Sequence, residues 1–269
     1  MAKNIKLSYN MNIPTLSELS AEGKKPEVLF WVGCAGSFDE RAKKITKSFV
    51  KILQKAGVSF AVLGTEESCT GDPAKRAGNE FLFQMQAMAN IEVMNAYQVR
   101  RIVTTCPHCF NTLKNEYPSL GGQFEVMHHT TFINTLLKEE RFTISGSVFK
   151  GKRITYHDPC YLGRANQIYQ APRELIKKLD AELVEMKNCK SKGLCCGAGG
   201  AQMFKEPEKG NKDINIKRTE QAMETQPEII AAACPFCNTM MSDGVKNKEQ
   251  ENKIHVKDIA ELISKAEDL

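Results

Sequence analysis

The cysteines of this 269-residue chain repeat along the sequence. Eight of the ten form two sets of four, and the second set follows the first at offsets of 126, 126, 128 and 128 residues: Cys34, Cys69, Cys106 and Cys109 correspond to Cys160, Cys195, Cys234 and Cys237. The motif CPHC in the first set matches CPFC in the second, and each follows an apolar run. This spacing indicates an internal duplication, with one cysteine constellation in each half.

One position breaks the match between the two halves. The second half reads Cys195-Cys196-Gly197, whereas the first half reads Cys69-Thr70-Gly71. The first half therefore offers four thiols and the second half five. Cys189 has no counterpart in the first half, and we assign it to neither set.

Apolar runs and helical periodicity predict alternating strands and helices in both halves. Strands are expected over 26–34, 58–64, 101–106, 124–128, 153–158, 181–186, 228–234 and 253–258, and helices over 39–57, 73–98, 172–179 and 214–225. Each CxxC motif leads into a helix, and His128-His129 resembles a helix start. Met85, Met88 and Met94 follow helical spacing, so we expect them in the core. The alternation predicts an α/β fold of two duplicated, Rossmann-like domains with mainly parallel sheets.

The predicted strands also place the cysteines. In open parallel sheets, sites form at the carboxyl ends of the strands. Cys34, Cys106 and Cys234 fall at predicted strand ends, and Cys160 follows another by two residues. We therefore expect a cysteine cluster at the carboxyl rim of each sheet. The predicted divisions are an N-terminal extension over 1–24, a first domain over 25–148 and a second over 149–269, joined near 145–152.

Composition excludes several classes of protein. Hydrophobic residues make up 42% of the chain and charged residues 26%, which is typical of a globular protein. The net charge is +5, but no basic stripe with interleaved aromatic residues indicates nucleic-acid binding. We find neither a signal peptide nor an apolar run near the ~18 residues of a membrane helix. We therefore expect a cytoplasmic protein with no membrane span of its own. Ten patterned cysteines in that setting predict metal or redox chemistry.

The pattern also bears on which metal is bound. Four thiolates hold iron–sulfur clusters, and structural zinc accepts four as well. Each half has one CxxC motif, with its other thiols far upstream in a core too large to need zinc for folding. Adjacent cysteines suit a cluster in which two thiolates reach different irons. These features favour iron–sulfur, with structural zinc and metal-free thiol–disulfide chemistry as the alternatives.

These motifs resemble those of the CCG-domain family, also called the cysteine-rich domain. The family includes components of heterodisulfide reductase and the iron–sulfur subunits of glycolate and lactate oxidases and of quinone-linked oxidoreductases. Its pattern is a lone Cys, a long gap, Cys-Cys-Gly, a similar gap and Cys-x-x-Cys. The second half matches in full, and the first half matches with Thr70 as its one substitution. The stretches HDPCYLGR (157–164) and LCCGAGG (194–200) resemble family sequences too.

The resemblance implies two [4Fe-4S] clusters and their ligands. Cys34, Cys69, Cys106 and Cys109 would bind the first; Cys160, Cys195, Cys196, Cys234 and Cys237 would bind the second, which is noncubane in heterodisulfide reductase. Thr70 supplies no thiolate, so we expect an ordinary cubane in the first half. The glycines expected to let backbone amides approach the clusters are Gly71, Gly197, Gly199 and Gly200. Cys196 and His157 are the candidate catalytic residues, although His157 also fits a packing or supporting role beside Cys160.

The implied function is that of an iron–sulfur oxidoreductase subunit working within a complex. Electrons would pass through the two clusters between a flavoprotein or soluble donor, such as electron-transfer flavoprotein, and a membrane partner linked to quinone or haem. The chain would then lie in the cytoplasm or peripherally on the inner face of the membrane. The alternatives are the catalytic subunit of a heterodisulfide or disulfide reductase and a zinc-stabilised interaction module.

Overall fold

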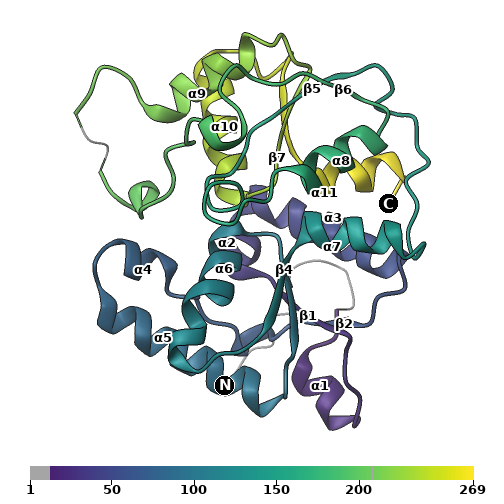
Figure 1. Ribbon diagram of the computed structural model, residues 1–269, viewed down its shortest axis with the longest axis vertical. Helices are drawn as coiled ribbons and strands as arrows, with labels where there is room; N and C mark the ends of the chain where they lie inside the picture. The colour runs from purple at the N-terminus through teal and green to yellow at the C-terminus, as the bar shows by residue number, and fades with distance from the viewer. Residues whose placement is uncertain (1–12, 207–208) are drawn as a thin grey trace.

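The computed structural model describes residues 13–206 and 209–269. Two α/β domains are stacked along the long axis of the molecule, with the first half of the chain below and the second half above (Figure 1). Part of the predicted N-terminal extension lies outside the described residues. Its remainder includes α1 (Leu16–Ala21), and Thr15 forms a parallel bridge with Val62 beside the first sheet.

The first domain contains a four-stranded parallel sheet in the order β2-β1-β3-β4. Its strands are β1 (Val28–Trp31), β2 (Phe60–Ala61), β3 (Arg101–Thr104) and β4 (Glu125–His128). Its helices are α2 (Gly33–Phe38), α3 (Glu40–Lys55), α4 (Asp72–Arg76), α5 (Glu80–Ala96), α6 (Pro107–Asn111) and α7 (His129–Lys138). The buried face of α3 carries Ile45, Phe49 and Leu53, and the Asp39 side chain caps its start by accepting from the Ala42 amide at 2.7 Å.

The second domain repeats this arrangement. Its sheet has the order β6-β5-β7-β8 and is again parallel throughout. The strands are β5 (Arg153–Tyr156), β6 (Glu182–Leu183), β7 (Ile229–Ala232) and β8 (His255–Asp258), and the helices are α8 (Gln170–Lys178), α9 (Ile214–Met223), α10 (Pro235–Asn247) and α11 (Ile259–Ala266). The same strand order in both halves confirms the duplicated α/β fold, and all eight predicted strands are present.

The helix predicted over 73–98 is wrong in one respect, because it is two helices. The chain breaks between α4 and α5, where Gly78 has a φ of +86° and the Asn79 side chain caps α5 by accepting from the Leu82 amide at 3.0 Å. The expected burial of the methionines is correct only for Met94. Met85 and Met88 are 54% and 59% exposed, because they lie outside the face of α5 that buries Phe83 and Ala87.

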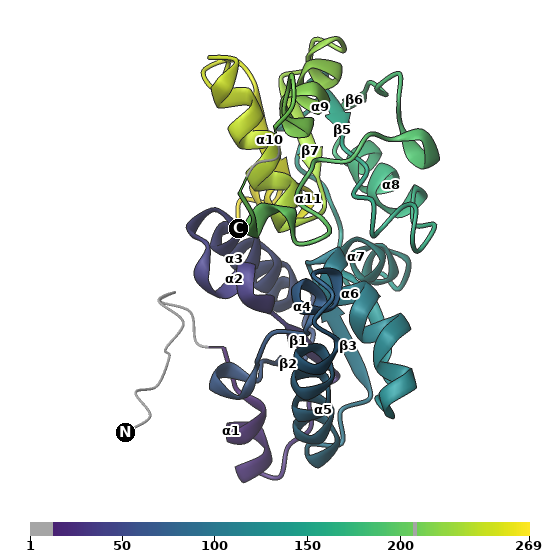
Figure 2. The same ribbon diagram turned by 90° about the vertical axis from the view of Figure 1, so that its left-hand side faces the viewer.

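The domains meet through pairs of equivalent helices. α3 packs against α11, and α7 packs against α8 (Figure 2). α3 and α8 follow the first strand of their domains, and α7 and α11 follow the last. Each contact therefore joins the first-strand helix of one domain to the last-strand helix of the other, as at the interface of a twofold dimer. Across this interface the Arg41 guanidinium donates to Glu261 at 2.7 Å, and His129 Nε2 lies 3.0 Å from Asp258 Oδ1. Since His129 and Asp258 lie at strand ends, the carboxyl ends of both sheets face the interface.

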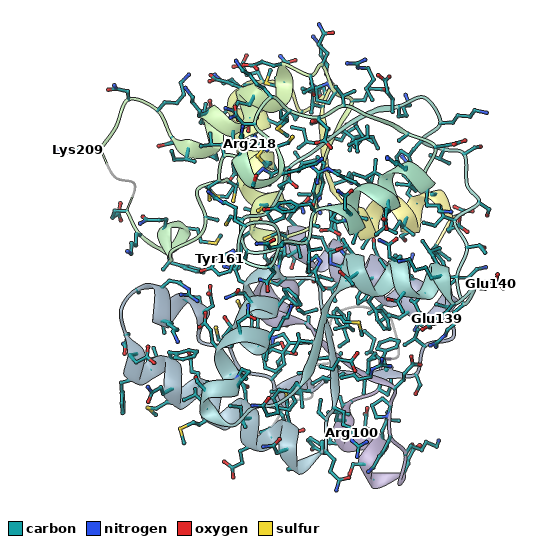
Figure 3. All side chains as sticks on the ribbon, in the orientation of Figure 1. Arg100, Glu139, Glu140, Tyr161, Lys209 and Arg218 are labelled. Atoms are coloured by element: carbon teal, nitrogen blue, oxygen red, sulfur yellow. The ribbon has the colours of Figure 1, made fainter. Side chains whose placement is uncertain are left out.

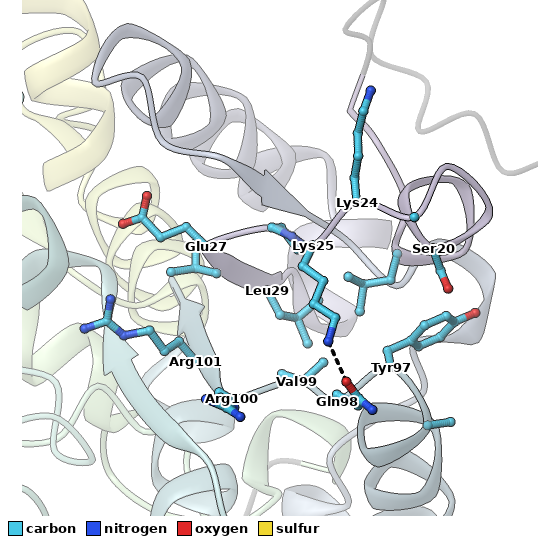
Figure 4. Close-up of a pocket in the computed structure, with 15 residues that line it drawn as sticks. Ser20, Lys24, Lys25, Glu27, Leu29, Tyr97, Gln98, Val99, Arg100 and Arg101 are labelled. Atoms are coloured by element: carbon cyan, nitrogen blue, oxygen red, sulfur yellow. Dashed lines mark hydrogen bonds between the residues drawn. The ribbon is translucent and has the colours of Figure 1, made fainter.

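One cavity lies at the opposite, amino end of the first sheet. It has a volume of about 610 Å³ and lies beside the amino ends of β1 and β3, where Lys25 hydrogen-bonds Gln98 (Figure 4). None of its described lining residues is a cysteine. The cavity is therefore separate from the predicted sites. No helix in the described part of the chain is long and apolar enough to cross a membrane.

Candidate metal centres

The four cysteines of the first half gather at the carboxyl end of the first sheet. Cys34 lies in α2 directly after β1, Cys69 in the loop after β2, and Cys106 and Cys109 where β3 leads into α6. Cys69 raises the pKa of Cys34, and Cys106 raises that of Cys109, so the thiols of each pair lie close together. The two pairs also interact electrostatically, so the four thiols form one group.

The five cysteines of the second half gather in the same way. Cys196 Sγ lies 3.4 Å from Cys237 Sγ. Cys195 lies close enough to Cys160, and Cys234 to Cys237, to raise the pKa of these thiols. Cys196, Cys234 and Cys237 are buried in a small apolar cluster with Ala198 and Ala232. The structure therefore brings together all five thiols predicted for the second centre. All ten cysteines of the chain are free.

The same backbone turn supports both sets. The Gly71 amide donates to Cys69 Sγ at 3.5 Å, and the Gly197 amide donates to Cys195 Sγ at 3.3 Å. Both glycines have positive φ, +87° and +92°, which side chains rarely adopt. Gly199 and Gly200 lie farther along the second loop. A Cβ on Gly199 would be 3.8 Å from His108 Cε1, whereas one on Gly200 would meet open space.

Neighbouring thiols in each set shift each other's pKa values. A hydrogen bond from Cys34 lowers the pKa of Cys69 to about 6 despite its burial, and the same bond raises the pKa of Cys34. In the second set, hydrogen bonds from Cys160 and Cys196 lower the pKa of Cys195 and raise those of the two donors. Ionising a whole set would place several like charges together, so it requires a cation among them. Both donor sets therefore fit a metal ion or an iron–sulfur cluster.

His157 lies beside the second set at the end of β5. It is fully buried, and its Nδ1 accepts from Arg218 Nε at 3.0 Å. Burial, assisted by the Arg218 charge, lowers its pKa to about 3, so the ring is neutral and carries its proton on Nε2. Nε2 has no hydrogen-bond partner among the described residues, and a ring nitrogen lies within 4.8 Å of the Cys196 and Cys237 sulfurs. The ring is therefore a hydrogen-bond donor beside those sulfurs.

Two carboxylates, which the sequence did not mark as functional, hold the cysteine loops in place. Glu67 accepts from the amides of Val32 and Gly33 at 3.0 and 2.6 Å, which ties the Cys69 loop to the segment before Cys34. Burial raises the pKa of Glu67 to about 7. No local motif predicts this contact, because Glu67 is one of many loop carboxylates in the sequence.

In the second half, the carboxylate that joins the cysteine loops belongs to the loop of the first cysteine, Cys160. Asp158, which precedes Cys160, accepts from the Lys190 amide at 2.7 Å and from both terminal nitrogens of Arg173 at 2.7 and 2.9 Å. Arg173 also donates to Glu185, and Glu185 hydrogen-bonds the Cys189 thiol. Cys189 therefore belongs to this ion-pair network.

Comparison with known proteins supports the assignment of the two cysteine sets as iron–sulfur sites. The family model described as "Cysteine-rich domain" (CCG) matches residues 28–114 and again residues 154–242, once over each cysteine set. The probable iron-sulfur-binding oxidoreductase FadF of Bacillus subtilis is 47% identical over 94% of this chain and 36% of that protein. The EtfAB:quinone oxidoreductase of Syntrophomonas wolfei is 45% identical over 92% of this chain and 35% of that protein.

A more distant relative is a component of the dihydromethanophenazine:CoB--CoM heterodisulfide reductase of Methanosarcina barkeri. It is 32% identical over 90% of this chain and 59% of that component. The chain thus spans about a third of the length of the first two relatives. Because the family model matches both halves, the chain belongs to the CCG cysteine-rich domain family.

Proposed function

We propose that this chain is the two-centre electron-transfer part of an iron–sulfur oxidoreductase. The observation that carries the proposal is the convergence of two thiol sets at sheet rims that face one domain interface. Two centres on opposite sides of one interface are suited to passing single electrons from one to the other. The proposed domains are residues 25–148 and 149–269, with one centre each.

Each set would hold one [4Fe-4S] cluster. Cys34, Cys69, Cys106 and Cys109 would bind the first, and Cys160, Cys195, Cys196, Cys234 and Cys237 the second. When bound, such a cluster accepts and releases one electron at a time. Because Thr70 stands where the second half has Cys196, we assign an ordinary cubane to the first set and a five-thiolate cluster to the second.

The surrounding residues would tune and shield these clusters. The amides of Gly71 and Gly197 already donate to cysteine sulfurs, and hydrogen bonds to sulfur are one of the factors that set a cluster's potential. The Nε2–H of His157 would add a donor on the buried side of the second cluster, with Arg218 fixing its tautomer. Gly199 and Gly200 would let the loop pass close over that cluster.

The relatives suggest the wider setting. One is named an EtfAB:quinone oxidoreductase and another a heterodisulfide reductase subunit. We infer that this chain works within a complex, taking electrons from a flavoprotein such as electron-transfer flavoprotein and passing them toward a quinone- or haem-linked membrane partner. It would lie peripherally on the inner face of the membrane.

Anaerobic purification followed by iron, sulfide and zinc analysis and EPR tests the proposal. We expect iron and acid-labile sulfide in amounts that match two clusters, and reducible EPR-active centres. A colourless protein that holds zinc and takes up no iron on reconstitution would overturn the proposal and favour a zinc-stabilised interaction module.

A second candidate function is disulfide reduction at the five-cysteine centre. It is favoured by the close Cys196–Cys237 contact and by the likeness to a heterodisulfide reductase component. The reaction takes two electrons and two protons and converts one disulfide into two thiols, so the first centre would deliver the electrons one at a time. Turnover of a disulfide by the reduced protein that disappears in Cys196→Ser supports this candidate, and turnover unaffected by that change excludes it.

A further inference from the structure

Arg218 carries a positive charge into the core of the second domain. It lies in α9, its side chain is fully buried, and an arginine stays protonated at any ordinary pH. Figure 3 shows it inside the second domain, above Tyr161. Burying an ion without a partner is costly, so a buried guanidinium is normally paired with an anion. The groups around Arg218 therefore show what compensates its charge.

The groups that contact the Arg218 guanidinium are neutral. Its Nε donates to His157 Nδ1 at 3.0 Å, and its Nη1 donates to the Asn188 carbonyl oxygen at 2.8 Å and to Gln221 Oε1 at 2.9 Å. Nη2 is buried and has no hydrogen-bond partner among the described residues. In the described part of the chain, no carboxylate forms an ion pair with this side chain. Direct contacts therefore leave its charge uncompensated.

The carboxylate with the largest electrostatic effect on Arg218 is Asp158, and it is already paired. Both terminal nitrogens of Arg173 donate to it, and the same guanidinium donates to Glu185. The charge of Lys190 also acts on Glu185. Two carboxylates and two cations thus balance each other, and this network leaves no negative charge for Arg218.

The second cysteine set lies beside this buried cation. His157, which accepts from Arg218, has a ring nitrogen within 4.8 Å of the Cys196 and Cys237 sulfurs. A single imidazole therefore links the guanidinium to those two sulfurs, and both cysteines also act electrostatically on Arg218. Thiolates that bind a cluster would be the anions that this buried charge lacks.

The first half has a neutral residue at the equivalent position. The buried positions of α5 and α9 match at the 128-residue offset of the CxxC motifs: Asn90, Ile91 and Met94 correspond to Arg218, Thr219 and Ala222. Asn90 donates to the Cys69 carbonyl oxygen at 3.0 Å and brings no charge to the first set. The second half thus has one more buried positive charge at this position and one more thiol.

We propose that Arg218 is a positioning residue whose buried positive charge balances the fifth thiolate, Cys196, and raises the reduction potential of the second cluster. This inference rests on the proposed function, because it requires a cluster on the second cysteine set. A fixed positive charge favours the more negative, reduced state of a nearby cluster, and its effect is strongest where both are shielded from water. Arg218 is neither oxidised nor reduced in this role.

Three variants separate the charge of Arg218 from its hydrogen bonds. Arg218→Gln keeps N–H donors and removes the charge, whereas Arg218→Lys keeps the charge. Arg164→Gln is the matched control, because it removes an exposed arginine from the loop after Cys160, where water screens the charge. EPR-monitored redox titration of the protein with both clusters bound gives the two midpoint potentials, and Cys106→Ala identifies the signal of the first cluster.

We expect Arg218→Gln to lower the second cluster's potential by about tenfold in the reduction equilibrium, which is about 59 mV for one electron. Arg218→Lys and Arg164→Gln should stay near the wild-type value, and the first cluster should be unaffected in all three variants. Equal shifts in Arg218→Gln and Arg218→Lys would indicate a structural role and overturn the inference. An unchanged second potential in Arg218→Gln would overturn it too.

Retention of iron in the presence of a chelator tests the link to Cys196. Arg218→Gln should lose the second cluster's iron faster than the wild type, or fail to load that cluster. In the background of Cys196→Thr, which has one thiolate fewer, the same change should have a smaller effect on retention. An equal or larger effect in that background would overturn the inference. Absence of clusters from the wild type would instead refute the proposed function.

Discussion

The two domains share one scaffold and differ in the residues between their thiols. Both sheets have the same strand order, and both hold a thiol under a glycine amide, at Gly71 and at Gly197. At the next equivalent position, Thr70 is buried with its carbonyl accepting from the Tyr117 hydroxyl at 3.2 Å, whereas Cys196 places a fifth thiol 3.4 Å from another sulfur. The fold thus fixes four thiol positions in each half, and one neighbouring residue distinguishes the two centres.

The loops that carry these thiols are tied together in different ways. In the first half Glu67 accepts two backbone amides, and it belongs to the loop of the second cysteine. In the second half Asp158 belongs to the loop of the first cysteine and is held by Arg173 as well as by an amide. Each half therefore uses one carboxylate to hold its loops in register, but only the second buries an ion pair to do so.

The strongest test of the comparison removes one thiol from the four-cysteine set. Cys106→Ala should abolish the first cluster, because no spare thiolate is present, and should lower the iron content by about half. The EPR signal of the second cluster should persist. Cys189→Ala is the matched control, since that thiol contacts Glu185 and lies outside both sets. Full iron in Cys106→Ala, or loss of iron in Cys189→Ala, would contradict the assignment.

The next largest effect is on stability and concerns the two carboxylates, Asp158 and Glu67, that hold the cysteine loops together. Arg173→Met leaves the buried carboxylate of Asp158 without its cation and should lower the free energy of unfolding by about 3–5 kcal/mol. Glu67→Gln should cost about 1–3 kcal/mol, because it disturbs hydrogen bonds without leaving a charge unpaired. Anaerobic urea unfolding measures both values.

The control for the loop ties is Lys177→Met, an exposed change on the same helix as Arg173 that should alter stability by no more than about 0.5 kcal/mol. If Arg173→Met costs no more than this control, the buried ion pair does not hold the second pair of loops. If Glu67→Gln lowers the free energy of unfolding as much as Arg173→Met does, the carboxylates of the two halves contribute equally to stability.

Much of this arrangement follows from the sequence. The repeated spacing predicted two like domains, and the rule for parallel sheets placed Cys34, Cys106 and Cys234 at strand ends that the structure brings to one interface. These predictions succeed because they depend on local apolar runs and on a regular architecture.

The remaining features depend on packing between distant segments. The sequence contains Arg218 and His157 61 residues apart, and nothing local shows that one fixes the tautomer of the other. The ring contact between His108 and Phe236 likewise exists only because the domains dock with their sheet rims together. Helical spacing also failed to show that Met85 faces solvent, since periodicity identifies a face of a helix but not what covers it.

A subtler test exchanges the residue that distinguishes the two halves. Cys196→Thr gives the second set the composition of the first, so iron should be retained on the remaining four thiols. The EPR signal of the second cluster should change and approach that of the first. The converse change, Thr70→Cys, should alter only the first signal. Loss of iron from Cys196→Thr would show that the fifth thiol is required to hold the cluster.

The smallest predicted effect is a pH dependence of stability at the end of the last strand of each sheet. The first half has His128 at this position and the second half has Asp258, and both side chains are fully buried. Burial, with His129 as a second cause, lowers the pKa of His128 far below the ordinary value near 6.5. The unfolded chain therefore binds a proton below pH 6.5 that the folded chain does not, and stability falls as the pH falls.

Between pH 7.5 and 5.5 this single group should cost the wild type about 1.4 kcal/mol, or about 3–5 °C in the thermal midpoint. His128→Gln removes the titrating ring. Between the same two pH values its free energy of unfolding should therefore fall less than that of the wild type, and the difference should equal the contribution of His128. Paired thermal scans at the two pH values measure the difference, with His255→Gln, a change at an exposed position on β8, as the control. Equal losses in the wild type and His128→Gln would show that His128 is protonated in the folded domain.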